Sequence, residues 1–114
     1  MADPRIRQIK IKTGVVKRIA KEKVVYEKEV DQQKNRIQKL KDEGQDEHTI
    51  RKQEEVLQES LMMVPECQRR LVKAHTDLKN TLESEQDLAE NEDYIAAQQA
   101  LKDAEPQLPE ASLE

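Results

Sequence analysis

A seven-residue repeat of apolar residues runs through the middle of the chain and limits what the chain can fold into. The repeat is carried by Ile50, Leu57, Val64, Leu71 and Leu78. A repeat of this period is typical of a helix whose seam packs against other helices. Further apolar residues widen the face in its middle, namely Val56, Leu61 and Met63. A wide face favours a bundle with two neighbouring helices over a strict two-stranded coiled coil.

Pro65 lies inside this repeat, in the run Leu61-Met62-Met63-Val64-Pro65-Glu66-Cys67. A proline in a helix interior lacks a backbone donor and clashes with the carbonyl group four residues earlier, which costs about 3 kcal/mol. The repeat nevertheless continues in phase on both sides of Pro65. We therefore predict one helix with a proline kink. The alternative is a turn at Val64-Pro65, but no Gly, Asn or Ser stands beside it to favour a turn.

The composition confines the chain to helices. Of 114 residues, 2% are aromatic and 39% are charged, and there is no Trp, no Phe and only 2 Gly. Strands need β-branched and aromatic residues between Gly-rich turns, whereas long helices are rich in Glu, Lys, Gln and Leu. The predicted fold class is therefore all-α, in one domain.

Capping residues divide the chain into helices. Asp3-Pro4 is a helix start and Gly44 is a helix stop, so the first helix is predicted at about residues 4–42. Asp46 is the predicted N-cap of a second helix at about 46–83. The short connection makes these helices antiparallel neighbours. With a third helix, they predict a coiled-coil-like, three-helix up-down-up bundle.

The third helix is predicted to be shorter, at about residues 85–104, which completes a bundle over residues 1–105. Ser84 is its expected cap, and Asn91 is the alternative. At about 1.5 Å per residue, a helix of this size spans roughly 30 Å, against roughly 57 Å for each long helix. We therefore expect it to leave about residues 28–60 as a two-helix arm.

The last residues of the chain are predicted to be disordered. Pro106 and Pro109 stand among acidic and small residues. Such a segment has too few apolar side chains to offset the entropy cost of ordering. We expect an acidic disordered tail at residues 106–114.

Sites for catalysis, metals or cofactors are not expected. His48 and His75 are far apart in the sequence, and no His, Cys and Asp cluster has metal-ligand spacing. Cys67 and His75 could act as nucleophile and base, but they are separated by about 12 Å of rise on one helix, well beyond hydrogen-bond reach. We interpret both histidines as surface residues and Cys67 as a structural thiol.

A cytoplasmic location is expected from the sequence. The opening residues Met1-Ala2-Asp3-Pro4-Arg5 lack the apolar core of a signal peptide. No apolar run approaches the roughly 18 residues that span a bilayer, so no membrane association is expected. The single cysteine is compatible with a reducing compartment.

Charge is distributed unevenly along the chain. Residues 1–41 carry 13 Lys/Arg against 5 Asp/Glu, a net charge of +8, whereas residues 81–114 carry 1 against 10, a net charge of −9. We expect the basic first helix to pair with the acidic third helix. An acidic protein that binds the basic face with Lys17, Arg18 and Lys21 is the second interpretation. Nucleic acid binding is not expected, because aromatic residues for stacking are nearly absent.

Met62 and Met63 beside Pro65 form the other candidate for partner binding. Methionine is unbranched and polarizable, so it adapts to irregular apolar surfaces. The alternative is that the pair only fills gaps around the proline kink. Both interpretations remain open from the residues alone.

Two stretches of the chain resemble a known family. The run Gln58-Glu59-Ser60-Leu61-Met62-Met63-Val64-Pro65-Glu66-Cys67, followed by Arg70-Leu71, resembles the signature of tubulin-specific chaperone A, also called tubulin-folding cofactor A. Residues 9–18 and 26–29 are similar to the first helix of that family. The likeness covers roughly residues 2–95. Leu61 departs from the pattern, in which a basic residue is usual.

The resemblance implies a function in tubulin folding. Members of the family are three-helix bundles that capture β-tubulin monomers in the cytoplasm and pass them toward the αβ heterodimer. They are neither enzymes nor users of a cofactor. By this resemblance the chain is expected to be a cytoskeleton-associated chaperone with β-tubulin as its partner. The wide apolar face and the short third helix favour a monomer when the chain is alone. The alternative function is a homodimeric coiled-coil scaffold or adaptor without a role in tubulin folding.

Overall fold

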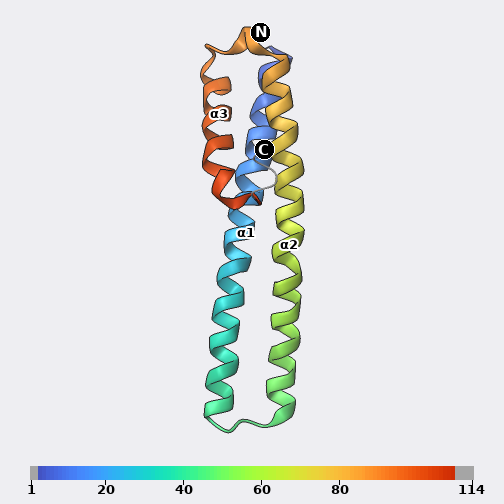
Figure 1. Cartoon of the computed structure of the whole chain (residues 1–114), viewed down its shortest axis with the longest axis vertical. Helices are drawn as coiled ribbons and strands as arrows, with labels where there is room; N and C mark the ends of the chain where they lie inside the picture. The colour runs from blue at the N-terminus through green and yellow to red at the C-terminus, as the bar shows by residue number, and fades with distance from the viewer. Residues whose placement is uncertain (1–2, 110–114) are drawn as a thin grey trace. The chain divides into compact units, whose positions relative to one another are not determined.

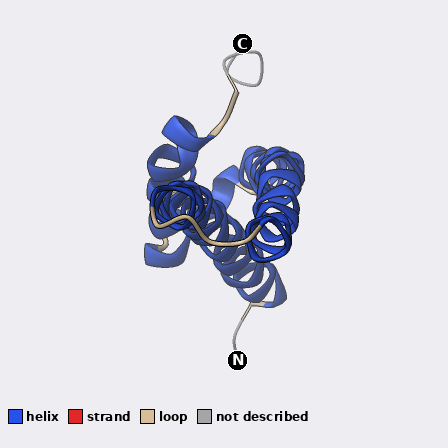
Figure 2. Cartoon of the chain, turned by 90° about the horizontal axis from the view of Figure 1, so that it is seen from below, coloured by secondary structure: helices blue, strands red, loops and turns tan. Residues whose placement is uncertain are grey.

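The computed structural model describes residues 3–109, which form helices and contain no β-strand (Figure 1, Figure 2). Three α-helices are present: α1 (Pro4–Asp42), α2 (Glu47–Ser84) and α3 (Glu92–Ala104). Two short 3₁₀ helices follow α2 and α3, namely η1 (Gln86–Leu88) and η2 (Glu105–Gln107). The prediction of an all-α chain with two long helices and a shorter third is confirmed.

The chain is divided into two compact units. The first, which we call the three-helix unit, is formed by Met1–Lys21 together with Gln68–Glu114. The second, which we call the hairpin unit, is formed by Glu22–Cys67. Each long helix therefore contributes residues to both units.

Capping groups set the ends of the long helices, as the sequence predicts. The Asp3 carboxylate accepts a 2.9 Å hydrogen bond from the backbone N–H of Arg5, at the start of α1. Gly44 has a φ of +71°, a left-handed conformation that favours glycine, and it follows the end of α1. The Asp46 carboxylate accepts a 2.8 Å hydrogen bond from the backbone N–H of Thr49 and caps α2.

Helix α2 runs without interruption through Pro65. This excludes the alternative of a turn at Val64-Pro65. The helix persists because its apolar repeat continues on both sides of the proline, with Leu57 and Val64 half-buried before it and Leu71 fully buried after it. The kink itself stays a prediction.

The third helix begins later than predicted. Asn91, not Ser84, is its cap, because the Asn91 side chain accepts a 2.8 Å hydrogen bond from the backbone N–H of Asp93. Ser84 is instead the last residue of α2, and its hydroxyl donates to the Asn80 carbonyl at 3.0 Å. The expected helix at 85–104 is thus a connection containing η1, followed by α3 with 13 residues.

The ordered chain also continues beyond the expected start of the tail. Glu105–Gln107 form η2, and Leu108 is buried with 8% of its surface exposed. Leu108 belongs to the core of the three-helix unit, so an apolar side chain holds residues 106–108 in place. The rest of the predicted tail, from residue 110, lies outside the described residues.

The core of the three-helix unit is aliphatic and gathers side chains from all three α-helices. Its members are Ile9, Val16, Ile19, Leu71, Leu78, Leu82, Tyr94, Ala97, Ala104 and Leu108. The Tyr94 hydroxyl donates a 2.9 Å hydrogen bond to the Leu82 carbonyl, and the His75 ring lies 3.1 Å from the Leu101 carbonyl. The residue near the start of α3 contacts the end of α2, and the residue near the end of α3 contacts an earlier part of α2, so the two helices are antiparallel. The up-down-up order is confirmed in this unit.

The seam of the hairpin unit is less apolar. Val30, Ile37 and Cys67 are buried, but so are Lys23 and Gln33, with 9% and 4% of their surfaces exposed. The Gln33 amide donates to the side chain and backbone oxygens of Gln53, and the Lys23 ammonium lies 2.9 Å from a Glu27 carboxylate oxygen. The Gln33–Gln53 bonds therefore join the two helices of the hairpin unit in addition to apolar packing, whereas the Lys23–Glu27 pair lies within α1.

Candidate functional site

The candidate site in the hairpin unit is an exposed apolar region around Met62. Met62 has 70% of its surface exposed, Leu61 has 37%, and Pro65 is also exposed. Met63 is half-buried. The structure thus separates the two methionines, because Met62 faces solvent while Met63 lies at the edge of the seam.

Helix geometry explains this separation. Val64 and Leu57 belong to the seven-residue repeat, and both are partly buried in the hairpin seam. At about 100° per residue, Met62 lies roughly 160° from Val64 around the helix. The side chain of Met62 therefore points away from the partner helix, and burial within the chain does not explain its apolar character. The gap-filling interpretation fits Met63 but not Met62.

The second candidate, in the three-helix unit, is the basic face of α1. Lys17, Arg18 and Lys21 are all exposed, while Val16 and Ile19 between and beside them are buried. Arg18 also makes a polar contact within the chain. The apolar positions anchor α1, and the three cations are presented to solvent.

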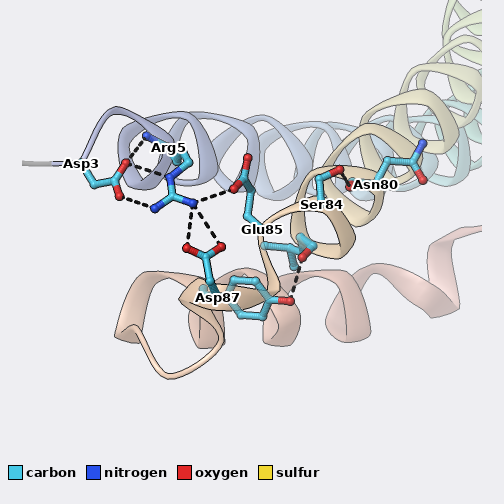
Figure 3. A network of polar contacts seen from close by, with 8 residues as sticks. Asp3, Arg5, Asn80, Ser84, Glu85 and Asp87 are labelled. Atoms are coloured by element: carbon cyan, nitrogen blue, oxygen red, sulfur yellow. Dashed lines mark hydrogen bonds and ion pairs between the residues drawn. The ribbon is translucent and has the colours of Figure 1, made fainter.

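The ion pairs of the basic helix agree in part with the predicted pairing between the first and third helices. The Arg5 guanidinium lies 2.9 Å from carboxylate oxygens of both Glu85 and Asp87, and 2.8 Å from Asp3 (Figure 3). The Lys12 ammonium lies 3.2 Å from an Asp77 carboxylate oxygen. Glu85 and Asp87 belong to the acidic segment that was predicted as the third helix, so the Arg5 pairs agree with the prediction, although the structure places both residues in the connection before α3. Lys12 instead pairs with α2.

The Arg5 cluster is an electrostatic anchor for the start of α1. Hydrogen bonds from the Arg5 side chain and backbone lower the pKa of Asp3 below its ordinary value. The same side-chain bond, together with bonds to Asp87 and Glu85, raises the pKa of Arg5. The cluster was not visible in the sequence, because its members lie about 80 residues apart and meet only after folding.

Two of the three residues considered for chemistry, Cys67 and His75, are engaged in packing. Cys67 is fully buried, and the His75 ring is occupied by the Leu101 carbonyl in the three-helix unit. His48 is exposed near the start of α2. Within residues 3–109, no three His, Cys, Asp or Glu side chains are grouped to hold a metal ion. Over the same residues, no helix is long and apolar enough to cross a membrane.

Comparisons with known proteins give a consistent result. The sequence model of the family described as tubulin binding cofactor A matches residues 4–101. Tubulin-specific chaperone A of Bos taurus is 61% identical over 101 residues, which cover 89% of this chain and 94% of that protein. Tubulin-folding cofactor A of Arabidopsis thaliana is 43% identical over 106 residues, covering 91% and 94%. The solved structure of human tubulin chaperone cofactor A matches with a TM-score of 0.77 at 53% identity, covering 90% of this chain and 99% of that one.

Proposed function

The chain belongs to the tubulin binding cofactor A family, and on this premise we propose that it is a tubulin-folding chaperone that captures β-tubulin monomers on the way to the αβ heterodimer. The names of its relatives support a role in tubulin folding. A protein that binds only the folded monomer stabilises it by mass action. The proposed mechanism is therefore the covering of a tubulin surface, without a chemical step or a cofactor.

The observation that carries this proposal is the exposure of Met62. Met62 stands mid-helix and has 70% of its surface in solvent, more than any of the other exposed large apolar residues in the part of the chain that the structure describes, which range from 37% to 52%. Together with Leu61 and Pro65 it forms apolar surface that no other part of its own unit covers. Such surface is typical of a protein-binding region.

The basic face with Lys17, Arg18 and Lys21 is the second proposed contact. Its exposed cations would attract acidic groups on the bound protein. Such an attraction is screened by salt, because the Debye length falls to about 8 Å at physiological ionic strength. Binding that weakens as salt is raised would support the contact, and salt-independent binding would remove it.

The free chain is proposed to be a monomer that acts in the cytoplasm, in association with the tubulin cytoskeleton. Burial within one chain supports the monomer, since Ile9, Val16, Leu71 and Leu78 are fully enclosed without a second copy. Family membership supports the location. The alternative of a homodimeric scaffold predicts instead a stable dimer that ignores tubulin.

The test is the affinity for isolated β-tubulin of a variant with Met62→Ala and Met63→Ala. We expect binding to weaken about tenfold, in the range for a well-placed apolar contact. Circular dichroism should show the helix content of the unchanged protein. Ile95→Ala is the matched control, because Ile95 lies on α3 with 52% of its surface exposed. Equal affinities for all three proteins would refute the Met62 contact.

A further inference from the structure

We propose that α2 presents a docking surface for a basic amphipathic segment of β-tubulin. This surface, which we call the Met62 surface, consists of the side chains of Leu61, Met62 and Pro65 and the backbone carbonyl oxygen of Leu61. The inference rests on the proposed function and extends it, because it specifies the charge and the hydrogen-bonding groups of the segment that is bound.

The apolar part of the surface is contiguous along one side of the helix. Leu61 and Pro65 are four residues apart, so their side chains are neighbours on successive turns, and Met62 lies beside both. Met62 has 70% of its surface exposed and Leu61 has 37%, and Pro65 is also exposed. An unbranched, flexible thioether adapts its shape to the apolar side chain that it meets.

The polar part of the surface is created by Pro65. In an α-helix, the carbonyl group of a residue accepts a hydrogen bond from the N–H four residues later. Pro65 stands four residues after Leu61 inside α2 and has no N–H. The Leu61 carbonyl therefore lacks its usual helical donor and can accept a hydrogen bond from another molecule. The two residues that define this backbone acceptor, Leu61 and Pro65, are both exposed.

The surroundings of the surface are acidic. Residues 53–68 contain four glutamates and no lysine or arginine, so this stretch carries a net charge of −4. Arg51 and Lys52 precede this stretch and Arg69 and Arg70 follow it, so the acidic character is confined to the part of α2 that carries the Met62 surface. Glu59 and Glu66 stand three residues before and four residues after Met62, on the same side of the helix.

These features together define the occupant. An apolar anchor would pack on Met62 and Leu61, while a lysine or arginine next to it would meet the acidic side chains. Lysine and arginine carry only donors, so they can also satisfy the Leu61 carbonyl. A segment with an apolar residue flanked by basic residues matches all three demands. An acidic segment or a nucleic acid would be repelled.

The first test uses overlapping synthetic peptides that cover the β-tubulin sequence as probes for the full-length chain. The peptides retained through the Met62 surface should be those that combine Lys or Arg with apolar residues, and Met62→Ala should weaken them about tenfold. Ile95→Ala should leave them bound. Peptides that are acidic, or that bind equally to the Met62→Ala protein, would overturn the proposal.

The second test isolates the carbonyl group. Pro65→Ala supplies the missing N–H, so it should raise the melting temperature, because proline is unfavourable inside a helix. It should also weaken the binding of β-tubulin about threefold to tenfold, the range for one lost hydrogen bond. Greater stability combined with weaker binding cannot be explained by misfolding. Greater stability with unchanged binding would overturn the role of the carbonyl.

A backbone substitution separates the carbonyl group from the proline ring. Replacement of Pro65 by L-lactic acid removes the ring but adds no N–H, because the linkage becomes an ester. Such a chain can be assembled from two segments joined at Cys67, which is the single cysteine. Its affinity should lie between that of Pro65→Ala and that of the unchanged protein, because it loses the contact of the ring but keeps the Leu61 carbonyl without a helical donor. An affinity as low as that of Pro65→Ala would mean that the ring, not the carbonyl, makes the contact.

The outcomes distinguish this inference from the proposed function. If the unchanged protein binds no β-tubulin, both fail. If it binds β-tubulin and the Met62→Ala and Pro65→Ala proteins bind as tightly, only the docking surface fails. If light scattering shows a homodimer that Met62→Ala dissociates, then a second copy occupies the surface, and the inference is wrong.

Discussion

The hydrogen bond from Tyr94 to Leu82 gives the sharpest prediction about stability. Tyr94 has 4% of its surface exposed, and its hydroxyl donates to the Leu82 carbonyl at 2.9 Å. Tyr94→Phe removes this donor without opening a cavity. The Leu82 carbonyl also accepts from the Glu85 N–H at 3.2 Å, so it keeps one partner. We therefore expect a loss of about 1 kcal/mol in the free energy of unfolding, and not the larger cost of an orphaned buried group.

The size of the thermal shift depends on how much of the chain unfolds together. With an unfolding entropy of about 2.1 cal/mol/K per residue, a transition of the whole chain would lower the melting temperature by about 4 °C for each kcal/mol. A transition of the three-helix unit alone involves fewer residues, roughly 70, and would lower it by about 7 °C. The shift therefore also reports whether the two units unfold as one.

The assay is urea and thermal unfolding followed by circular dichroism at 222 nm. Tyr94→Phe should lower the urea midpoint and leave the slope unchanged. Tyr26→Phe is the matched control: Tyr26 is half-buried and has no hydrogen bond from its hydroxyl within residues 3–109, so its change should be near zero. A loss below about 0.3 kcal/mol for Tyr94→Phe would refute the reasoning, because it would mean that the buried hydroxyl contributes nothing net.

Three other predictions concern caps, glycines and pH. Asn91→Ala should destabilise the chain by about 1 kcal/mol, because it removes the N-cap hydrogen bond of α3. Hydrogen exchange should show reduced protection of the α3 amides, and unchanged protection would refute the prediction. Gly14→Ala should stabilise the folded chain by roughly 0.5–1 kcal/mol, since the added methyl group meets nothing within 4 Å. Gly44→Ala should destabilise it, because a φ of +71° is unfavourable for alanine. Urea midpoints that move in the same direction for both variants would contradict this. Asp3 and Asp46 have lowered pKa values in the folded protein, through hydrogen bonds from Arg5 and Thr49 respectively. The stability that these two carboxylates contribute is complete above the ordinary pKa of 3.8 and is lost as the pH falls below it. The free energy of unfolding of the double variant Asp3→Asn with Asp46→Asn should therefore fall less steeply below about pH 4 than that of the unchanged protein.

The features that the sequence predicted well depend on local rules. The start of α1 at Asp3-Pro4, the stop at Gly44 and the cap at Asp46 are each set by one or two residues and their neighbours. The seven-residue repeat likewise fixes which side of α2 is buried, since it only requires a regular helix. Local chemistry is sufficient for such features.

The features that it missed depend on contacts between distant residues. Ser84 and Asn91 are both good caps by composition, and the choice between them follows from where Tyr94 and Leu82 meet. The burial of Leu108 likewise depends on the core that it joins. Because these contacts form only after the helices pack, the sequence could not place the start of α3 or the end of the ordered chain.

The candidate site was predicted in part. Met62, Met63 and Pro65 were identified from the sequence, but the exposure that distinguishes Met62 from Met63 required the helix phase in the structure. The missing donor for the Leu61 carbonyl follows once Pro65 is known to lie within an uninterrupted helix. Sequence reasoning supplied the residues, and the structure supplied their orientation.

The central claim is that this chain is a monomeric chaperone for β-tubulin. Size-exclusion chromatography with light scattering tests it most directly, on the chain alone, with isolated β-tubulin, and with the intact αβ heterodimer. We expect a monomer near 13.3 kDa that co-elutes with β-tubulin and does not associate with the heterodimer. A stable homodimer that is indifferent to both forms of tubulin would contradict it and would favour a scaffold function.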